Sequence, residues 1–338
     1  MKTITRILIA LVFIMLTERA EALTIIRIFT GGTPPTNSIG AGNITNIFNA
    51  ACDVWELIIQ DDYVLTIYYG WNTNGAGEHV LGIQGGIPNR EAQGTNYFNN
   101  DNNPGHMSWY LDPNPLLHIG YTNYIEQVVT NLGGGPINAT RWFIGPSSGP
   151  QIDLFTAALH EIGHALGLSF GNTSFMSEST DGDIDVTAPR PFSGTTIPLQ
   201  FNFSGVTSHI AYVSDRTLMS GSFSPGDRVL PSELDIVALA QLSKFSQLNL
   251  KLAPRLKIAG PYMTTSTVIK KGKPAGTITM NTVMLSWIQP INDYSVEISP
   301  DLANWSSVTN VPAVTNGVYN VTVSTTNDTS FFRLKKLP

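Results

Sequence analysis

The chain changes character near residue 253, and this change limits most strongly what it can fold into. Residues 23–254 hold 8 Lys and Arg against 19 Asp and Glu, a net charge of −11, whereas residues 255–338 hold 8 against 4, a net charge of +4. Helical and strand-like spacings alternate in the first part, while the second contains only short strand-like runs separated by Gly, Pro, Asn and Asp. We therefore expect an α+β domain over 23–252 and a β-sandwich over 253–338.

Residues 1–22 have the pattern of an export signal. Lys2 and Arg6 precede the apolar run Ile7–Leu16, and Ala20–Ala22 is a small-x-small cleavage site. The run is too short to span a bilayer, and no other segment approaches about 18 uninterrupted apolar residues. We expect this signal peptide to be removed, which predicts a secreted or cell-surface protein without a membrane span.

Cysteine content and charge exclude two classes of protein. Cys52 is the only cysteine, so neither an intrachain disulfide nor a Cys-rich zinc knuckle can form. The formal net charge is −6 and no long run of Lys and Arg occurs, so we expect no nucleic-acid partner.

Local patterns predict the elements around this framework. Residues 46–60 have apolar side chains at helical spacing, with the cysteine in the buried face, and 63–69 predict a largely buried strand. Residues 85–105 are rich in Gly, Asn and Pro, which predicts a long surface loop, and Met107–Leu111 predicts a further strand. In the second part, strands are predicted at 276–280, 283–288, 293–298, 304–308, 317–324 and 330–335.

Residues 153–167 predict a helix that carries a metal-binding pattern. An Asp begins this segment, a Gly ends it, and apolar residues recur at helical spacing between them. His160 and His164 lie one turn apart on the same face, which is the separation that two imidazole ligands of one zinc ion require. Glu161 lies beside them and can reach a water on the metal rather than the metal itself.

This set of residues suits peptide hydrolysis. Zinc lowers the pKa of its water toward about 7, and a carboxylate can take the proton of that water as it attacks a carbonyl. The alternative interpretation is a helix that merely carries two surface histidines.

The stretch resembles the metzincin group of zinc metallopeptidases, whose motif is His-Glu-x-x-His-x-x-Gly-x-x-His. Gly167 matches the glycine of that motif, but Phe170 stands in the place of the third histidine. Leishmanolysin-like metzincins are similar in having an insertion before their last ligand. The resemblance implies a zincin-like fold in which 168–208 is the insertion, His209 is the third zinc ligand and Met219 is the Met-turn residue beneath the metal.

The residues themselves leave the third ligand open. Asp215, Glu178 and Glu233 are alternatives to His209, and a carboxylate ligand would make the site more similar to that of the gluzincins. Residues 231–242 predict an apolar helix with a capping box, where the resemblance places the helix that follows the Met-turn.

Two other groups of polar residues receive lesser roles. His79, His106 and His118 lack metal-ligand spacing, and we expect them to be structural or surface residues. The three carboxylates of Asp181–Asp185 could bind Ca²⁺, but the segment lacks the loop glycine and distal glutamate of an EF-hand. A solvated acidic loop is the favoured interpretation.

We therefore expect an exported zinc endopeptidase that acts on a protein or peptide substrate. His160, His164 and His209 would hold zinc, Glu161 would be the general base, and Met107–Leu111 would be the edge strand along the substrate. The alternative is a non-catalytic surface adhesion or binding protein with a structural or degenerate zinc site. The second part resembles β modules appended to exported bacterial proteins, and its positive charge favours contact with an anionic cell envelope.

Overall fold

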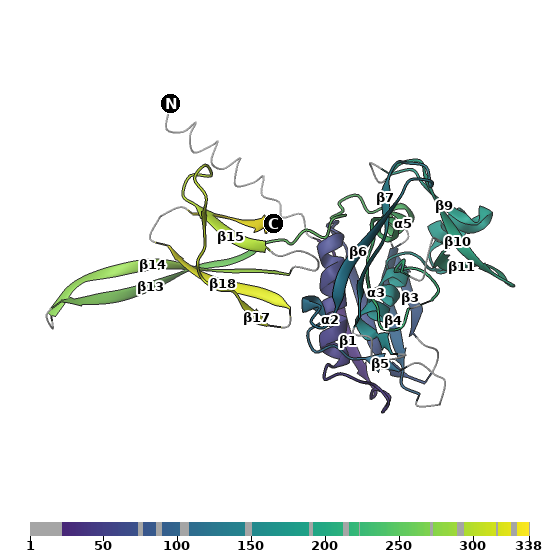
Figure 1. Cartoon of the computed structure of the whole chain (residues 1–338), viewed down its shortest axis with the longest axis horizontal. Coiled ribbons are helices and arrows are strands. Elements are labelled where there is room, and N and C mark those ends of the chain that lie inside the picture. Colours follow the sequence, from purple (N-terminus) through teal and green to yellow (C-terminus); the bar gives the residue numbers. More distant parts are fainter. Residues whose placement is uncertain are drawn as a thin grey trace.

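The computed structural model shows a mixed α/β chain built mostly of strands (Figure 1). Residues 1–21, the larger part of the predicted signal peptide, lie outside the described residues. Side chains are not described for 263–280. The structure describes residues 22–73, 77–85, 90–101, 108–145, 151–188, 192–211, 216–222, 224–270, 273–288, 294–315, 317–325 and 330–337.

A four-stranded sheet forms the centre of the first body and has the order β1-β2-β4-β3. The three strands β1, β2 and β4 run parallel, and β3 pairs antiparallel with β4 at one edge. Helices α2 and α3 both contact strands of this sheet and each other. The bounds are β1 Thr24–Gly31, β2 Val64–Asn72, β3 Gly77–Gly85, β4 Arg90–Asn99, α2 Ile44–Ile58 and α3 Leu154–Ala165.

The predicted surface loop at 85–105 is wrong, because residues 90–99 form the inner strand β4. Its polar residues misled the prediction. Glu91 and Asn96 are buried, and each forms a hydrogen bond with one ring nitrogen of His79 on β3. A polar strand can therefore lie inside the sheet because its side chains find partners on the neighbouring strand.

Helix α2 agrees with its prediction to within two residues at each end. Asn43 caps it by accepting from the backbone N–H of Asn46, and Cys52 is fully buried on its inner face. The indole N–H of Trp55 donates to the carbonyl of Leu159 at 3.0 Å. This hydrogen bond fixes α2 against α3 through a fully buried aromatic side chain.

Helix α3 is anchored at its N-terminus by a buried ion pair. The carboxylate of Asp153 caps the helix by accepting from the N–H of Thr156, as the sequence predicts. Both oxygens of Asp153 accept from the guanidinium of Arg228 at 2.9 Å, and Arg228 also donates to Asp112 at 2.8 Å. All three charged side chains are buried, so the start of α3 is fixed from two directions.

The remaining elements of the first body form three small sheets, β5-β8, β12-β7-β6 and β11-β10-β9, and two further helices. Helix α5 begins with a capping box between Ser232 and Asp235, as predicted. The bounds are β5 Trp109–Tyr110, β6 Thr122–Val129, β7 Ile137–Ile144, β8 Ile152–Asp153, α4 Thr173–Glu178, β9 Asp183–Val186, β10 Thr195–Asn202, β11 Gly205–Ile210, β12 Arg228–Leu230 and α5 Glu233–Ser243.

The second body consists of the sheets β13-β14-β18-β17 and β16-β15-β19, which share one hydrophobic core around Trp287. This core is separate from the one that spans Leu23–Leu252, so a core lies on each side of the predicted domain junction. The runs predicted at 276–280 and 283–288 belong to one long strand. The bounds are β13 Lys257–Lys270, β14 Lys273–Ile288, β15 Tyr294–Ser299, β16 Ser306–Ser307, β17 Ala313–Thr315, β18 Val318–Thr325 and β19 Phe331–Lys336.

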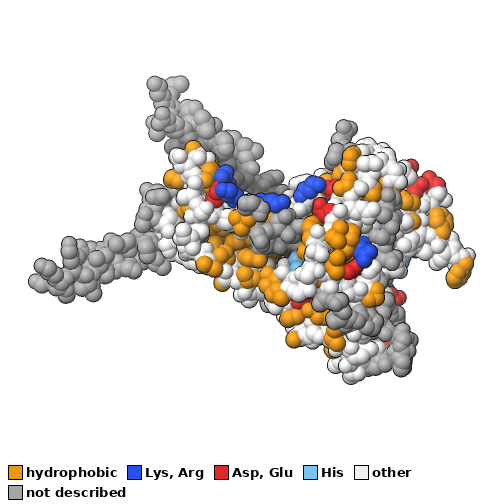
Figure 2. Space-filling view, in the orientation of Figure 1, with side chains coloured by type: hydrophobic (Ala, Val, Ile, Leu, Met, Phe, Trp, Pro, Cys, Tyr) orange, Lys and Arg blue, Asp and Glu red, His pale blue; other side chains and the backbone are white. Residues whose placement is uncertain are grey.

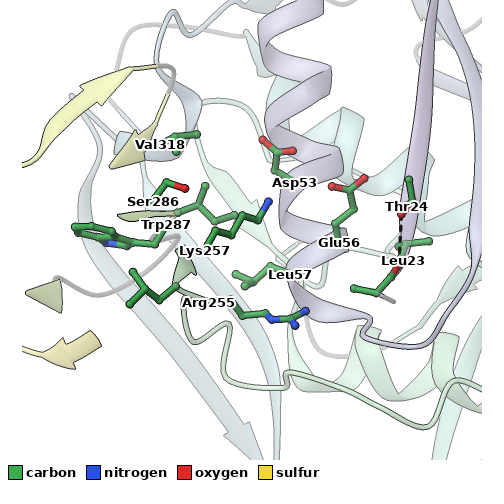
Figure 3. A pocket seen from close by; sticks show the side chains of 13 residues that line it. Leu23, Thr24, Asp53, Glu56, Leu57, Arg255, Lys257, Ser286, Trp287 and Val318 are labelled. Carbon is green, nitrogen blue, oxygen red and sulfur yellow. Dashed lines mark hydrogen bonds between the residues drawn. The ribbon is translucent and has the colours of Figure 1, made fainter. Parts of the chain in front are cut away.

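A cavity of about 650 Å³ lies between α2 and the start of β13, where the two bodies meet (Figure 3). Asp53 and Glu56 of α2 form its acidic side, and Arg255 and Lys257 form its basic side. Both acids already pair with Arg27 at 2.8 Å. The cavity thus lies at the junction of the two bodies and is lined by both charged and apolar side chains.

Candidate metal centre

Three histidines from two distant segments meet in the first body. His160 and His164 come from α3 and His209 comes from β11, and one ring nitrogen of each lies within 4.8 Å of the others. The Nε2 atoms of His160 and His164 are 3.0 Å apart, and the ring centroid of His209 lies 5.4 and 5.1 Å from theirs. We call these residues the histidine triad, and they are the three ligands that the sequence analysis favoured.

Backbone carbonyls fix the orientation of the two helical rings. His160 Nδ1 lies 2.7 Å from the carbonyl oxygen of Leu218, and His164 Nδ1 lies 2.6 Å from that of Leu168. A carbonyl can only accept, so each Nδ1 carries a proton and donates it. Each Nε2 atom therefore has its lone pair available for a ligand bond.

The two Nε2 atoms lie close together, and two adjacent lone pairs repel unless a cation lies between them. Burial, followed by the charge of His209, lowers the pKa of His160 to about 3, and burial lowers the pKa of His164 and of His209. The rings are therefore neutral at neutral pH. In a tetrahedral site with metal–nitrogen bonds of 2.0–2.1 Å, two imidazole nitrogens lie about 3.3 Å apart, so the geometry of the triad fits a bound metal ion.

Met219 lies below α3 and connects the triad to the rest of the fold. A Cβ atom on Gly163 would collide with the Met219 sulfur, so the glycine lets Met219 pack closely against α3 between the two histidines. The N–H of Met219 donates to Asp235 of α5, and its carbonyl accepts from the N–H of Ile210, the residue after His209. The segment around Met219 thereby ties β11, α3 and α5 together.

Glu161 lies beside the triad and is almost fully buried, at 3% exposure. No hydrogen bond or ion pair of its carboxylate occurs within the described part of the chain. Burial raises the pKa of Glu161 to about 8, and the nearby charge of Glu78 adds to the shift. Gly77 lies against it, since a Cβ atom there would be 2.5 Å from Glu161 Oε1.

The triad and Glu161 open into a cavity of about 320 Å³. Strand β3 forms one wall, and β11 with the segment after Met219 contributes to the rest. None of residues 108–111 lines it, and Met107 lies outside the described residues. The lining residues are Gly77, Glu78, His79, His160, Glu161, His164, Ser169, Ser208, His209, Gly221 and Ser222.

No family model, curated protein or solved structure matches this chain. The resemblance to metzincins therefore stays a prediction from His160–Gly167, His209 and Met219. In the described part of the chain, no helix is both long and apolar enough to cross a membrane.

The two described alternatives for a third ligand are engaged elsewhere. Glu178 accepts hydrogen bonds from Gln241 and from the backbone of Asp185. Glu233 accepts from the N–H of Asn138 and pairs with a surface lysine at 2.6 Å. Neither glutamate lines the cavity, and the third alternative, Asp215, lies outside the described residues.

His79 lines the cavity, although no pattern in the sequence assigned it to the site. Its side chain is 2% exposed, lines the cavity, and bonds to Asn96 at 2.7 Å and to Glu91 at 2.9 Å. Both partners lie on β4, so no pattern of neighbouring residues indicates that His79 belongs to the site. His118 stacks on Phe143 as a structural residue, and His106 lies outside the described residues.

A second group of possible ligands lies near the surface. The carboxylates of Asp181, Asp183 and Asp185, which we call the aspartate cluster, come within 4.8 Å of one another. Figure 2 shows acidic side chains gathered at this end of the first body. Burial and the neighbouring carboxylates raise the pKa of Asp183. Ca²⁺ binding by this cluster stays a prediction.

Proposed function

We propose that the chain is an exported zinc endopeptidase of the metzincin type. The observation that carries the proposal is the pair of neutral imidazoles whose Nε2 atoms face each other at 3.0 Å, with a third imidazole beside them. Nitrogen ligands in this number are typical of zinc in proteins. The cleavage site at Ala20–Ala22 supports export.

The number of ligands favours a catalytic site over a structural one. Structural zinc sites are closed by four protein ligands, whereas catalytic sites have three and keep a position for water or substrate. Among the described residues, the group that includes the histidine triad has three members. The cavity next to them gives a substrate access to the same place.

Zinc held by the triad would polarise a peptide carbonyl and lower the pKa of a water toward about 7. Glu161 would accept the proton of the attacking water and later deliver it to the leaving amine. Burial brings the pKa of this carboxylate closer to that of a zinc-bound water, which favours exchange of a proton between the two. The backbone of Leu218 and Leu168 would hold the two imidazoles in the required tautomer.

An extended peptide would add to the sheet along β3. This strand is at the edge of the described sheet and forms a wall of the cavity, with Gly77 against Glu161. Pairing by main-chain hydrogen bonds would place the scissile carbonyl near the triad without need for a particular side chain. The zincin-like fold is supported by this edge strand, by α3 and by the position of Met219 under α3.

The test compares the purified chain with its Glu161→Gln variant. Both should bind one zinc ion per chain, and only the unsubstituted protein should hydrolyse an unstructured protein, with the variant slower by about 100-fold or more. Glu126→Gln, which changes a surface glutamate outside the cavity, is the matched control and should keep full activity. Equal zinc binding with no cleavage by any of the three would favour the adhesion or binding alternative.

A further inference from the structure

The cavity beside the histidine triad contains an acidic side chain that the mechanism does not use. Glu78 is exposed on β3 and lines the same cavity as Glu161. No hydrogen bond or ion pair of Glu78 occurs among the described residues. Its carboxylate is therefore available to a ligand that enters this cavity.

The described lining of the cavity consists of small and polar side chains. Apart from the histidines and the two glutamates, the described lining consists of serines and glycines. No lysine, arginine, aliphatic or aromatic carbocyclic side chain belongs to it. His79 is already bonded on both ring nitrogens by Glu91 and Asn96. A substrate group that carries a positive charge is the best complement to such a surface.

The position of Glu78 places this charge next to the reaction. Glu78 follows Gly77, whose Cβ position lies 2.5 Å from Glu161 Oε1, so it is one residue from the point where β3 touches the general base. A group bound by Glu78 would therefore belong to a substrate residue close to the scissile bond. The field of the whole first body acts in the same direction, since 23–254 carries a net charge of −11 (8 basic against 19 acidic residues).

We propose that Glu78 is a specificity-determining residue that selects a substrate with an ammonium or guanidinium group beside the scissile bond. The inference rests on the proposed endopeptidase function and adds the substrate class to it. A carboxylate forms charge-assisted hydrogen bonds with both cations, and such bonds are roughly twice as strong as neutral ones. The cation is either a Lys or Arg side chain or the free α-amine of a peptide cut near its N-terminus.

The experiment measures kcat/KM on matched peptides with the zinc-loaded full chain. The peptides differ at one position, Lys against its neutral isostere norleucine, and each is made with a free and with an acetylated N-terminus. We expect the Lys peptide to be cleaved about 10-fold faster than its isostere, and Glu78→Gln to reduce this ratio to near 1. Glu78→Lys should invert the preference toward a Glu peptide. Asp62→Asn, which removes an exposed charge outside the cavity, should keep the original ratio.

A binding measurement provides a second readout that does not depend on turnover. Affinity for the same peptides is measured by fluorescence anisotropy on Glu161→Gln and on Glu161→Gln/Glu78→Gln. The Lys peptide should bind the first variant about 10-fold more tightly than its isostere and the second equally well. A preference confined to free N-termini would identify the α-amine as the bound cation.

The outcomes separate this inference from the proposed function. If the unsubstituted chain cleaves Lys and norleucine peptides equally, or if Glu78→Gln leaves the ratio unchanged, the role of Glu78 is overturned while the peptidase stands. If zinc-loaded protein cleaves no peptide of the set, the peptidase proposal falls, and the specificity proposal falls with it.

Discussion

The histidine triad and the aspartate cluster are both groups of three possible metal ligands within 4.8 Å, but the fold treats them differently. The triad joins two distant segments and is mostly buried, and backbone carbonyls hold two of its rings. The aspartate cluster comes from one short segment, lies mostly at the surface, and consists of like charges that repel. Closeness of ligand atoms is thus weak evidence for a metal site. Hydrogen bonds that orient the ligand side chains, as in the triad, are stronger evidence.

Among the substitutions considered, the largest loss of stability should come from Arg228, which anchors the helix that carries two histidines of the triad. Removing its side chain in Arg228→Ala leaves Asp112 and Asp153 buried without their partner and frees the start of α3. We expect a loss of about 3–5 kcal/mol in the free energy of unfolding, measured by urea denaturation. Arg216→Ala, which breaks a more exposed pair with Asp227, is the control and should cost about 1 kcal/mol or less. Equal losses would show that the buried pair does not support α3.

The next largest effect should be the loss of zinc affinity when His209, the proposed third ligand, is removed. His209→Ala should weaken zinc binding by about 100-fold or more, because even substitutions outside the ligand shell cost about 10- to 100-fold. Competition with a chelator of known affinity measures the change. Asp183→Ala in the aspartate cluster should leave zinc affinity unaltered. Retention of tight, stoichiometric zinc by His209→Ala would instead point to a carboxylate as the third ligand.

Gly163→Ala tests the contact between α3 and Met219. Alanine favours a helix by about 1 kcal/mol over glycine, but here its methyl group meets the Met219 sulfur. We expect the steric clash to outweigh the helix propensity, so that the free energy of unfolding falls by about 1–2 kcal/mol. Thermal or urea unfolding measures the change. In a Met219→Ala background the same substitution should become stabilising. A stabilising effect in the native background would contradict the close contact.

The smallest effect should come from the aspartate cluster. The pKa of Asp183 is raised in the folded chain, so its charged form opposes folding at pH 7, and this cost disappears below the pKa of the unfolded chain. Asp183→Asn should therefore raise stability by about 0.3 kcal/mol at pH 7, because solvent screens an exposed group, and by nothing near pH 3. Melting temperatures at the two pH values check this. A stabilisation that persists near pH 3 would exclude charge repulsion as its cause.

The sequence predicts well those features that depend on neighbouring residues. The caps of α3 and α5 use side chains within three residues of the helix start, so their signals are local. The pairing of His160 and His164 follows from helical geometry alone. Cys52 is buried as expected from its place in an apolar helix face.

Features that depend on distant partners were missed. Strand β4 is polar along much of its length, and it is stable inside the sheet because His79 of another strand bonds to Glu91 and Asn96. No regular spacing in the sequence connects His79 with Glu91 and Asn96. Neither the strand nor the role of His79 could therefore be predicted from local patterns. The choice of His209 over the acidic alternatives required the position of the β10–β11 hairpin, which local patterns leave open.

The separation of His209 from the other two ligands along the chain has a consequence for stability. An ion bound by α3 and β11 together would act as a removable cross-link, and closing a long loop in this way would restrict the unfolded chain much as a disulfide bond does. The single cysteine is buried in α2, so this protein has no covalent means to the same end. Dialysis against a chelator should therefore expose the β10–β11 hairpin to proteolysis before the central sheet.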